Sequence, residues 1–184
     1  MKKLLLLFCL LPAVTFAQKI TINGKEGNRP LVWKDFDGKV NKEAPYWAAT
    51  YASIGCDLIN SDGVKNGETP KFQVTVGFGK ESWANRKKEL SDDLLKHEQG
   101  HFDIALICGA ELQKRLDDTT FTLKTCRAVS SRMYQEAYAK LRKMQFDYDR
   151  ETNHSKNSEE QAKWNAALAA GLARYAQLSL TNAQ

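Results

Sequence analysis

The chain has 184 residues and a formal net charge of +5, with 27 lysines and arginines against 22 aspartates and glutamates. The basic residues are spread along the sequence rather than gathered in one block, so the sequence gives no support for nucleic-acid binding. The length suffices for one domain with a sizeable hydrophobic core.

Residues 1–17 have the pattern of a signal peptide. Lys2 and Lys3 precede an apolar run from Leu4 to Leu11, and Thr15-Phe16-Ala17 resembles a cleavage site. The run is too short to span a bilayer stably, which makes an uncleaved anchor the lesser alternative. We therefore expect a secreted or periplasmic protein whose mature chain starts near Gln18 with a charge of +3, without stable membrane insertion.

Residues 18–80 predict strands separated by turns. Candidate strands cover residues 19–22, 31–36, 46–59 and 72–78, because apolar and polar residues alternate or β-favouring residues gather there. The last of them is expected beside the active site, where an edge strand would pair with the backbone of an extended peptide. The alternative is a purely structural strand.

A long helix is predicted from Ser91, a good N-cap residue, to about Asp117. It contains the pattern His-Glu-x-x-His, formed by His97, Glu98 and His101. On a helix, residues i and i+4 share a face, so both imidazoles can bind one zinc ion while Glu98 acts as general base. Both histidines fall on the apolar stripe, where unpaired ionisable groups are costly. The alternative is a pair of packed histidines without metal.

Two more helices should follow. Apolar residues at helical spacing predict one over residues 125–146, and Ser158 with Gln161 is typical of a capping box that starts the last. Together these elements predict an α+β fold, with N-terminal antiparallel strands, the metal-site helix and two further long helices. Residues 18–184 are expected to form this single domain.

A catalytic zinc site needs a third protein ligand. Asp103 lies on the opposite side of the helix from the histidines, and Glu111 is too far along it. We expect His154, the remaining histidine, with Asp149 or Asp147 as alternatives. In the same segment, Tyr148 is a candidate donor to the oxyanion that develops during hydrolysis, although a packed tyrosine is an equal alternative.

The mature chain has three cysteines, Cys56, Cys108 and Cys126. In an exported protein, one disulfide and one free thiol is the simplest arrangement. Cys108 with Cys126 is the preferred pair, and Cys56 is an alternative partner for either.

Three groups of residues resemble a bacterial family of predicted secreted zinc-dependent proteases, catalogued as a domain of unknown function. They are Leu31-x-Trp33-x-Asp35-Phe36-x-Gly38, then residues 95–104 around the histidine pair, and Tyr148-Asp149-x-x-Thr152-x-His154-Ser155 with Gln161 and Trp164. The family often has glycine in place of Ser155. The resemblance implies a zincin-like fold, a zinc ion and peptidase activity, and it favours His154 as a ligand.

The sequence therefore predicts a zinc metallopeptidase in which a metal-activated water attacks the peptide bond and Glu98 takes its proton. Its substrate would be a peptide or a protein. The alternative is a non-catalytic zinc-binding module of the cell envelope, and a second is an exported domain without metal. Substrate specificity and oligomeric state are not defined by the sequence.

Overall fold

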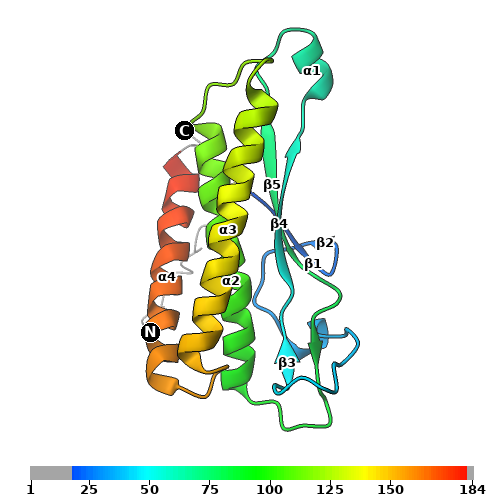
Figure 1. Ribbon diagram of the computed structural model, residues 1–184, viewed down its shortest axis with the longest axis vertical. Helices are drawn as coiled ribbons and strands as arrows, with labels where there is room; N and C mark the ends of the chain where they lie inside the picture. The colour runs from blue at the N-terminus through cyan, green and yellow to red at the C-terminus, as the bar shows by residue number, and fades with distance from the viewer. Residues whose placement is uncertain (1–17, 182–184) are drawn as a thin grey trace, which may run out of the picture.

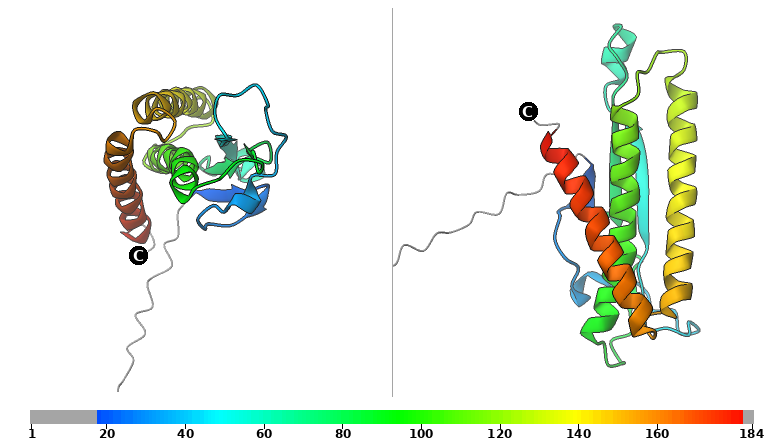
Figure 2. Two further views of the ribbon diagram at one scale, coloured as in Figure 1. Left: turned by 90° about the horizontal axis from the view of Figure 1, so that it is seen from below. Right: turned by 90° about the vertical axis from the view of Figure 1, so that its left-hand side faces the viewer.

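The computed structural model describes residues 18–181, with side chains to residue 176, and the predicted signal peptide at 1–17 lies outside this range. The long helix α2 (Asp92–Asp117) occupies the middle of the molecule. A β-sheet covers one side of it, and helices α3 (Cys126–Thr152) and α4 (Ser158–Thr181) cover the other (Figures 1 and 2). The fold is thus mixed α+β, with N-terminal strands and three long helices, as predicted.

The main sheet has the strand order β2-β1-β5-β4. Its members are β1 (Lys19–Ile22), β2 (Lys25–Glu26), β4 (Ala52–Leu58) and β5 (Phe72–Phe78). Strands β4 and β5 pair antiparallel from Ala52↔Phe78 to Leu58↔Phe72, but β1 runs parallel to β5. The predicted antiparallel pairing is thus found for β1 with β2 and for β4 with β5, but it was wrong for β1 with β5, which join the two antiparallel pairs.

Strand β5 lies between β1 and β4, so it has no free edge and cannot be the substrate-binding edge strand predicted from the sequence. A separate two-stranded sheet pairs β3 (Ala48–Ala49) with β6 (Trp83–Ala84). A short helix, α1 (Ser61–Lys65), interrupts the β4–β5 connection. The predicted run 46–59 is thus divided between β3 and β4.

The predicted strand at residues 31–36 instead contains a 3₁₀ helix, η1 (Trp33–Asp35). The carboxylate of Asp35 accepts a hydrogen bond from the backbone N–H of Val32 at 2.9 Å and pairs with Arg29. These local bonds satisfy backbone and side-chain groups without a neighbouring strand, and they favour a turn over an extended segment.

The predicted start of α2 is confirmed, since the Ser91 hydroxyl accepts a hydrogen bond from the N–H of Leu94 at 3.1 Å. Helix α3 runs to Thr152, beyond the predicted end near residue 146. The capping box predicted for α4 is wrong, because the Asn157 side chain accepts the N–H of Glu160 and Gln161 points elsewhere.

Helix α2 packs closely on β5. Val74, Val76 and Phe78 alternate along the strand and are at most 1 % exposed, as period-two alternation requires of one buried face. A Cβ at Gly109 would overlap the Val76 side chain, so glycine permits this close contact between helix and sheet. The core around α2 also includes Phe102, whose ring meets that of Phe78 edge to face.

The three long helices run up, down and up along the long axis, as the colours of Figure 2 show. The beginning of α2, the end of α3 and the beginning of α4 therefore lie at the same end of the molecule (Figure 1). This topology brings side chains more than 40 positions apart in sequence next to the histidine pair, as the contact between His101 and Gln145 illustrates.

All three cysteines of the described region are free, so the expected Cys108–Cys126 disulfide is not present. Cys126 begins α3 and lies near the end of α2, whereas Cys108 lies nine residues before that end, about 13 Å along the helix axis. The Cys108 thiol instead contacts the sulfur of Met144 at 3.9 Å. Within residues 18–181, no helix is both long and apolar enough to cross a membrane.

Candidate metal centre

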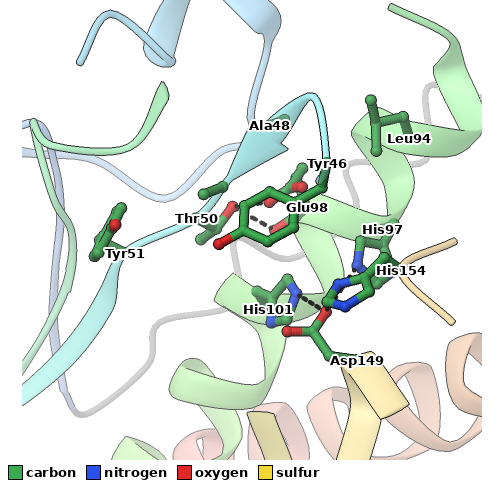
Figure 3. A pocket seen from close by; sticks show the side chains of 11 residues that line it. Tyr46, Ala48, Thr50, Tyr51, Leu94, His97, Glu98, His101, Asp149 and His154 are labelled. Carbon is green, nitrogen blue, oxygen red and sulfur yellow. Dashed lines mark hydrogen bonds and ion pairs between the residues drawn. The ribbon is translucent and has the colours of Figure 1, made fainter. Parts of the chain in front are cut away.

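The two histidines of α2 converge with an aspartate of α3. His97 and His101 are 2 % and 7 % exposed, one helical turn apart. The Nε2 atom of His97 lies 3.2 Å from Oδ1 of Asp149, and that of His101 lies 3.1 Å from the same oxygen (Figure 3). In the described part of the chain, these three residues form a group whose ligand atoms all lie within 4.8 Å of one another.

These distances fit the chemistry of a zinc site. Nitrogen and oxygen ligands lie about 2.0–2.1 Å from zinc, which places neighbouring ligands of a tetrahedral site about 3.3 Å apart. The two observed N···O distances, 3.2 and 3.1 Å, are close to that separation. Two histidines and one carboxylate are also a donor set used by catalytic zinc sites, with a fourth position left open.

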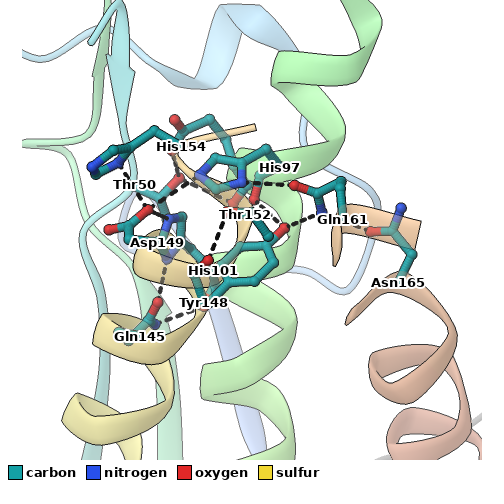
Figure 4. A network of polar contacts seen from close by, with 11 residues as sticks. Thr50, His97, His101, Gln145, Tyr148, Asp149, Thr152, His154, Gln161 and Asn165 are labelled. Atoms are coloured by element: carbon teal, nitrogen blue, oxygen red, sulfur yellow. Dashed lines mark hydrogen bonds and ion pairs between the residues drawn. The ribbon is translucent and has the colours of Figure 1, made fainter. Parts of the chain in front are cut away.

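Two glutamines determine which nitrogen of each imidazole carries the proton. Gln161 on α4 uses its Nε2 to donate to the Tyr148 hydroxyl at 2.7 Å, so its Oε1 faces Nδ1 of His97 at 2.9 Å. Gln145 on α3 donates to the His101 carbonyl at 2.9 Å, and its Oε1 likewise accepts from Nδ1 of His101 (Figure 4). Both Nδ1 atoms are therefore donors, and both Nε2 lone pairs of the neutral rings face Asp149.

This arrangement is unfavourable without a positive charge. Two imidazole lone pairs directed at one carboxylate oxygen repel it, unless each ring takes up a second proton or a cation lies among the three atoms. Burial alone lowers the pKa of His101, but the hydrogen bond to Asp149 and the charge of Glu98 outweigh it and raise this pKa. Burial raises the pKa of Asp149, and the hydrogen bonds that His101 and His97 donate from Nε2 when they carry the second proton reverse this shift and lower it well below its usual range.

Glu98 lies beside the histidine pair and is 3 % exposed. Its Oε2 accepts a hydrogen bond of 2.8 Å from the hydroxyl of Thr50, which follows β3. Glu98, both histidines and Asp149 line a cavity of about 190 Å³, whose opposite wall is the segment from Tyr46 to Tyr51 (Figure 3). The carboxylate is thus held at the flank of the three ligands and faces the open space.

Tyr148 is fully buried behind the site rather than in the cavity. Its ring stacks on His97 at 4.7 Å, and its hydroxyl donates to the His97 carbonyl while accepting from Gln161. Burial also raises its pKa. These contacts do not support the predicted oxyanion role, because the hydroxyl is occupied and Tyr148 does not line the cavity. A Cβ at Gly100 would overlap this hydroxyl, which explains a glycine inside α2.

His154 lies next to the cluster without belonging to it. Its Nδ1 is 3.1 Å from Oδ1 of Asp149, its side chain is 41 % exposed, and its ring stacks on Tyr46 at 5.4 Å. Asn153, His154 and Ser155 all have positive φ, from 48° to 69°, as the chain turns sharply between α3 and α4. The positive φ of Ser155 is a conformation that glycine adopts at lower cost.

The other acidic candidates are engaged elsewhere. Asp147, the second alternative ligand, pairs with Lys143 and Arg150, and Lys143 lowers its pKa. Asp103 accepts a hydrogen bond from Gln99, and Glu111 pairs with Lys140. The exclusion of Asp103 and Glu111 as ligands agrees with these positions.

Sequence reasoning did not identify Gln145, Gln161 or Thr50 as parts of the site. The sequence did contain a signal for Gln145. Leu141, Gln145 and Asp149 recur at i, i+4 and i+8, so they share one face of α3 with the buried Leu141. The spacing of Ser158 and Gln161 instead predicts a capping box for α4. For Thr50, nothing in the sequence indicated which part of residues 46–59 would meet α2.

Fold and site together define a mixed α+β protein with a buried candidate metal centre on its central helix. Residues 39–156, more than half of the chain, match the family described as bacterial protein of unknown function (DUF922). The chain therefore belongs to this family, whose description states no activity. No curated protein and no solved structure shows significant similarity to the chain.

Proposed function

We propose that this protein is an exported zinc-dependent metallopeptidase, in which His97, His101 and Asp149 hold the metal and Glu98 is the general base. The observation that carries the proposal is the convergence of two tautomerically fixed imidazoles on Oδ1 of Asp149. The match to a family of unknown function is compatible with this proposal but does not supply it. Export rests on the signal-peptide pattern of residues 1–17.

Zinc, when bound at these ligands, would polarise a peptide carbonyl and lower the pKa of a coordinated water to about 7. Glu98 is placed to take a proton from the attacking water and to pass it to the leaving amine. The hydroxyl of Thr50 holds one carboxylate oxygen of Glu98 at 2.8 Å, which leaves the other free for this transfer. Gln145 and Gln161 keep the imidazoles in the tautomer that a metal requires.

The peptide would lie along β3, which corrects the choice of β5 made from the sequence. In the described residues β3 pairs with β6 alone, so its second edge has no strand partner. Ala48, Ala49 and Thr50 line the cavity opposite Glu98. An extended peptide added at this edge would be held by its backbone, with its carbonyl carbon next to the general base.

The experiment that tests the proposal measures zinc per chain and peptide cleavage for three forms of the mature protein. The wild type should contain close to one zinc per chain and cleave an unstructured protein such as casein. Glu98→Gln should keep the zinc and lose at least about 100-fold of the activity, because proton transfer contributes about 10²–10⁴-fold. Glu111→Gln, the same change on an exposed part of α2, should alter neither.

Cleavage by Glu98→Gln at the wild-type rate would overturn the general-base assignment. Zinc without cleavage of any substrate in the wild type would favour the non-catalytic zinc-binding module. Absence of zinc after reconstitution would end the metal hypothesis altogether. Mass spectrometry of the exported protein, with Gln18 expected near the new N-terminus, tests the signal peptide separately.

A further inference from the structure

A second cavity of about 410 Å³ opens directly beside the candidate metal centre. Tyr46, Leu94 and His154 line both cavities, so the two form one continuous surface. The second cavity lies on the side of His154 and of the N-terminal end of α2. It is therefore within reach of any chain that passes the three ligands in an extended conformation, which advances about 3.3 Å per residue.

The second cavity has an aromatic and aliphatic part beside polar residues. Pro45, Tyr46 and Trp47 form one side, and Leu94 of α2 forms the other. Trp47 is 45 % exposed, and the ammonium of Lys88 lies 5.6 Å from its ring centre, so the ring is held by a cation and still presents part of its surface to solvent. Tyr46 is itself held by stacking on Trp83 at 5.9 Å, so this wall is supported from behind.

Two residues of opposite charge, Glu89 and Lys156, also border the cavity. Among residues 18–176, whose side chains the structure describes, neither takes part in an ion pair. The cavity thus carries one residue of each charge, and its border has no excess of either sign from this pair. Flat aromatic rings and a leucine, by contrast, favour a ring that stacks or packs edge to face against them.

The same backbone segment serves both cavities. Residues 46 and 48–51 line the first, whereas residues 45–47 line the second. A peptide that pairs with the free edge of β3 would therefore extend from one cavity to the other, with alternate side chains directed toward the protein.

We propose that the second cavity receives a large aromatic side chain of the peptide, from a residue adjacent to the bond that is cleaved. This inference rests on the proposed peptidase function and adds its substrate class, peptides with phenylalanine, tyrosine or tryptophan near the cleavage site. Trp47 is its main specificity-determining residue, because it is the large aromatic residue of this lining whose ring is partly exposed, 45 % of the residue being accessible.

The test uses binding, so that it does not depend on turnover. The zinc-loaded mature protein is titrated calorimetrically with phenylalanine hydroxamate and with alanine hydroxamate, whose hydroxamate group binds zinc. The phenylalanine compound should bind at least about tenfold more tightly, because burying an aromatic ring in an apolar site increases the binding constant by more than about tenfold. Trp47→Ala should bring this ratio close to one, and Leu94→Phe, which fills the cavity from α2, should lower it as well. Tyr138→Ala, an exposed aromatic residue of α3, should leave the ratio unchanged.

The outcomes separate this inference from the function on which it rests. If both hydroxamates bind to the wild type with equal affinity, the second cavity does not select aromatic side chains, and this inference is contradicted. The proposed metal centre would still be supported, because both compounds bind zinc. If Trp47→Ala keeps the full preference, Trp47 does not determine specificity and the inference is overturned. If the zinc-loaded protein binds neither compound, the zinc has no coordination position open to a ligand. This result would contradict both the proposed peptidase function and the aromatic pocket.

Discussion

The two walls of the candidate site differ in how firmly their residues are held. On the helical wall, His97, His101 and Tyr148 are at most 7 % exposed, and each makes at least one hydrogen bond to another helix. On the opposite wall, Trp47 and Tyr51 are 45 % and 50 % exposed, and the paired strand β3 has only two residues. Figure 4 shows the polar contacts of the helical wall, and Figure 3 shows residues of both walls around the cavity.

This difference separates two requirements of the proposed chemistry. A metal site must hold its ligands in a fixed geometry, which buried rings with paired second nitrogens provide. A peptide-binding surface must admit a chain and gain apolar contacts as it does so, which exposed aromatic rings next to a free strand edge provide. Variants of the helical wall should therefore alter zinc binding strongly, whereas variants of the opposite wall should alter it little.

The largest effect is expected for Asp149→Asn, which removes the charge of the proposed third ligand. Its zinc affinity should fall by more than about 100-fold, because loss of a residue that merely orients a ligand already costs about 10–100-fold. Competition with a coloured chelator measures this. Asp147→Asn, two residues away and held by Lys143 and Arg150, is the matched control and should bind zinc like the wild type.

Gly100→Ala should lower the free energy of unfolding of the metal-free protein by about 1–3 kcal/mol, since the new methyl group overlaps the Tyr148 hydroxyl. Alanine gains about 1 kcal/mol in helix propensity, which offsets part of this cost. Urea denaturation checks the value. Gly55→Ala, where a Cβ meets only ordinary contact distances, is the comparison. A fully stable Gly100→Ala protein would contradict the close packing of Tyr148 against α2.

Gln161→Leu and Gln145→Leu should each weaken zinc binding by about 10–100-fold, because they release Nδ1 of one histidine. Gln113 is a buried glutamine of α2 that lies outside the metal site. The variant Gln113→Leu therefore tests whether loss of any buried glutamine weakens zinc binding. Gln113 binds the backbone of β5, so its loss should lower stability and leave zinc affinity unchanged. Equal zinc affinities for all three variants would contradict an orienting role of Gln145 and Gln161.

The pH dependence of the metal-free protein should follow from the raised pKa of His101 and the lowered pKa of Asp149. A raised histidine pKa stabilises the fold below its ordinary value of 6.5, and this contribution is lost as the pH rises through the folded-state pKa. A lowered aspartate pKa stabilises the fold above 3.8 and is lost as the pH falls. Both contributions are complete between pH 3.8 and pH 6.5, so the metal-free protein should be most stable in this range.

Zinc must displace the proton of His101, so its affinity should fall by about tenfold per pH unit below the pKa of that histidine. Thermal unfolding with and without zinc, from pH 5 to pH 8, measures both dependences. A thermal shift caused by zinc that is as large at pH 5 as at pH 8 would contradict the assignment of His101 as a ligand.

The smallest effect on zinc is expected for His154→Ala, which should weaken binding by less than about tenfold. His154 approaches the carboxylate of Asp149 from outside the cluster and is 41 % exposed, so its removal leaves all three ligands in place. The same chelator competition measures it. A loss as large as that of Asp149→Asn would instead make His154 a ligand, as the sequence alone suggested.

Much of the fold followed from local patterns in the chain. Ser91 as N-cap, the end of α2 at Asp117 and the alternation of residues 72–78 were all predicted, because caps and periodicity act over a few residues. Residues 46–59 were predicted as one strand because their division depends on pairing with the distant β6. Residues 31–36 were predicted as a strand although the local bond from Val32 to Asp35 favours a turn, because β-favouring composition was given more weight than this polar contact. The free cysteines were missed for a similar reason, since sequence spacing does not give distances between helices.

By itself, the sequence determined the histidine pair, the neighbouring Glu98 and their common helical face, because a helix fixes the relation between residues i and i+4. Only the tertiary structure decided what surrounds them. The up-down-up course of α2, α3 and α4 placed Asp149, Gln145 and Gln161 around the imidazoles and turned Tyr148 behind them. Contacts between residues so distant in the chain arise from how helices pack, which no local pattern encodes.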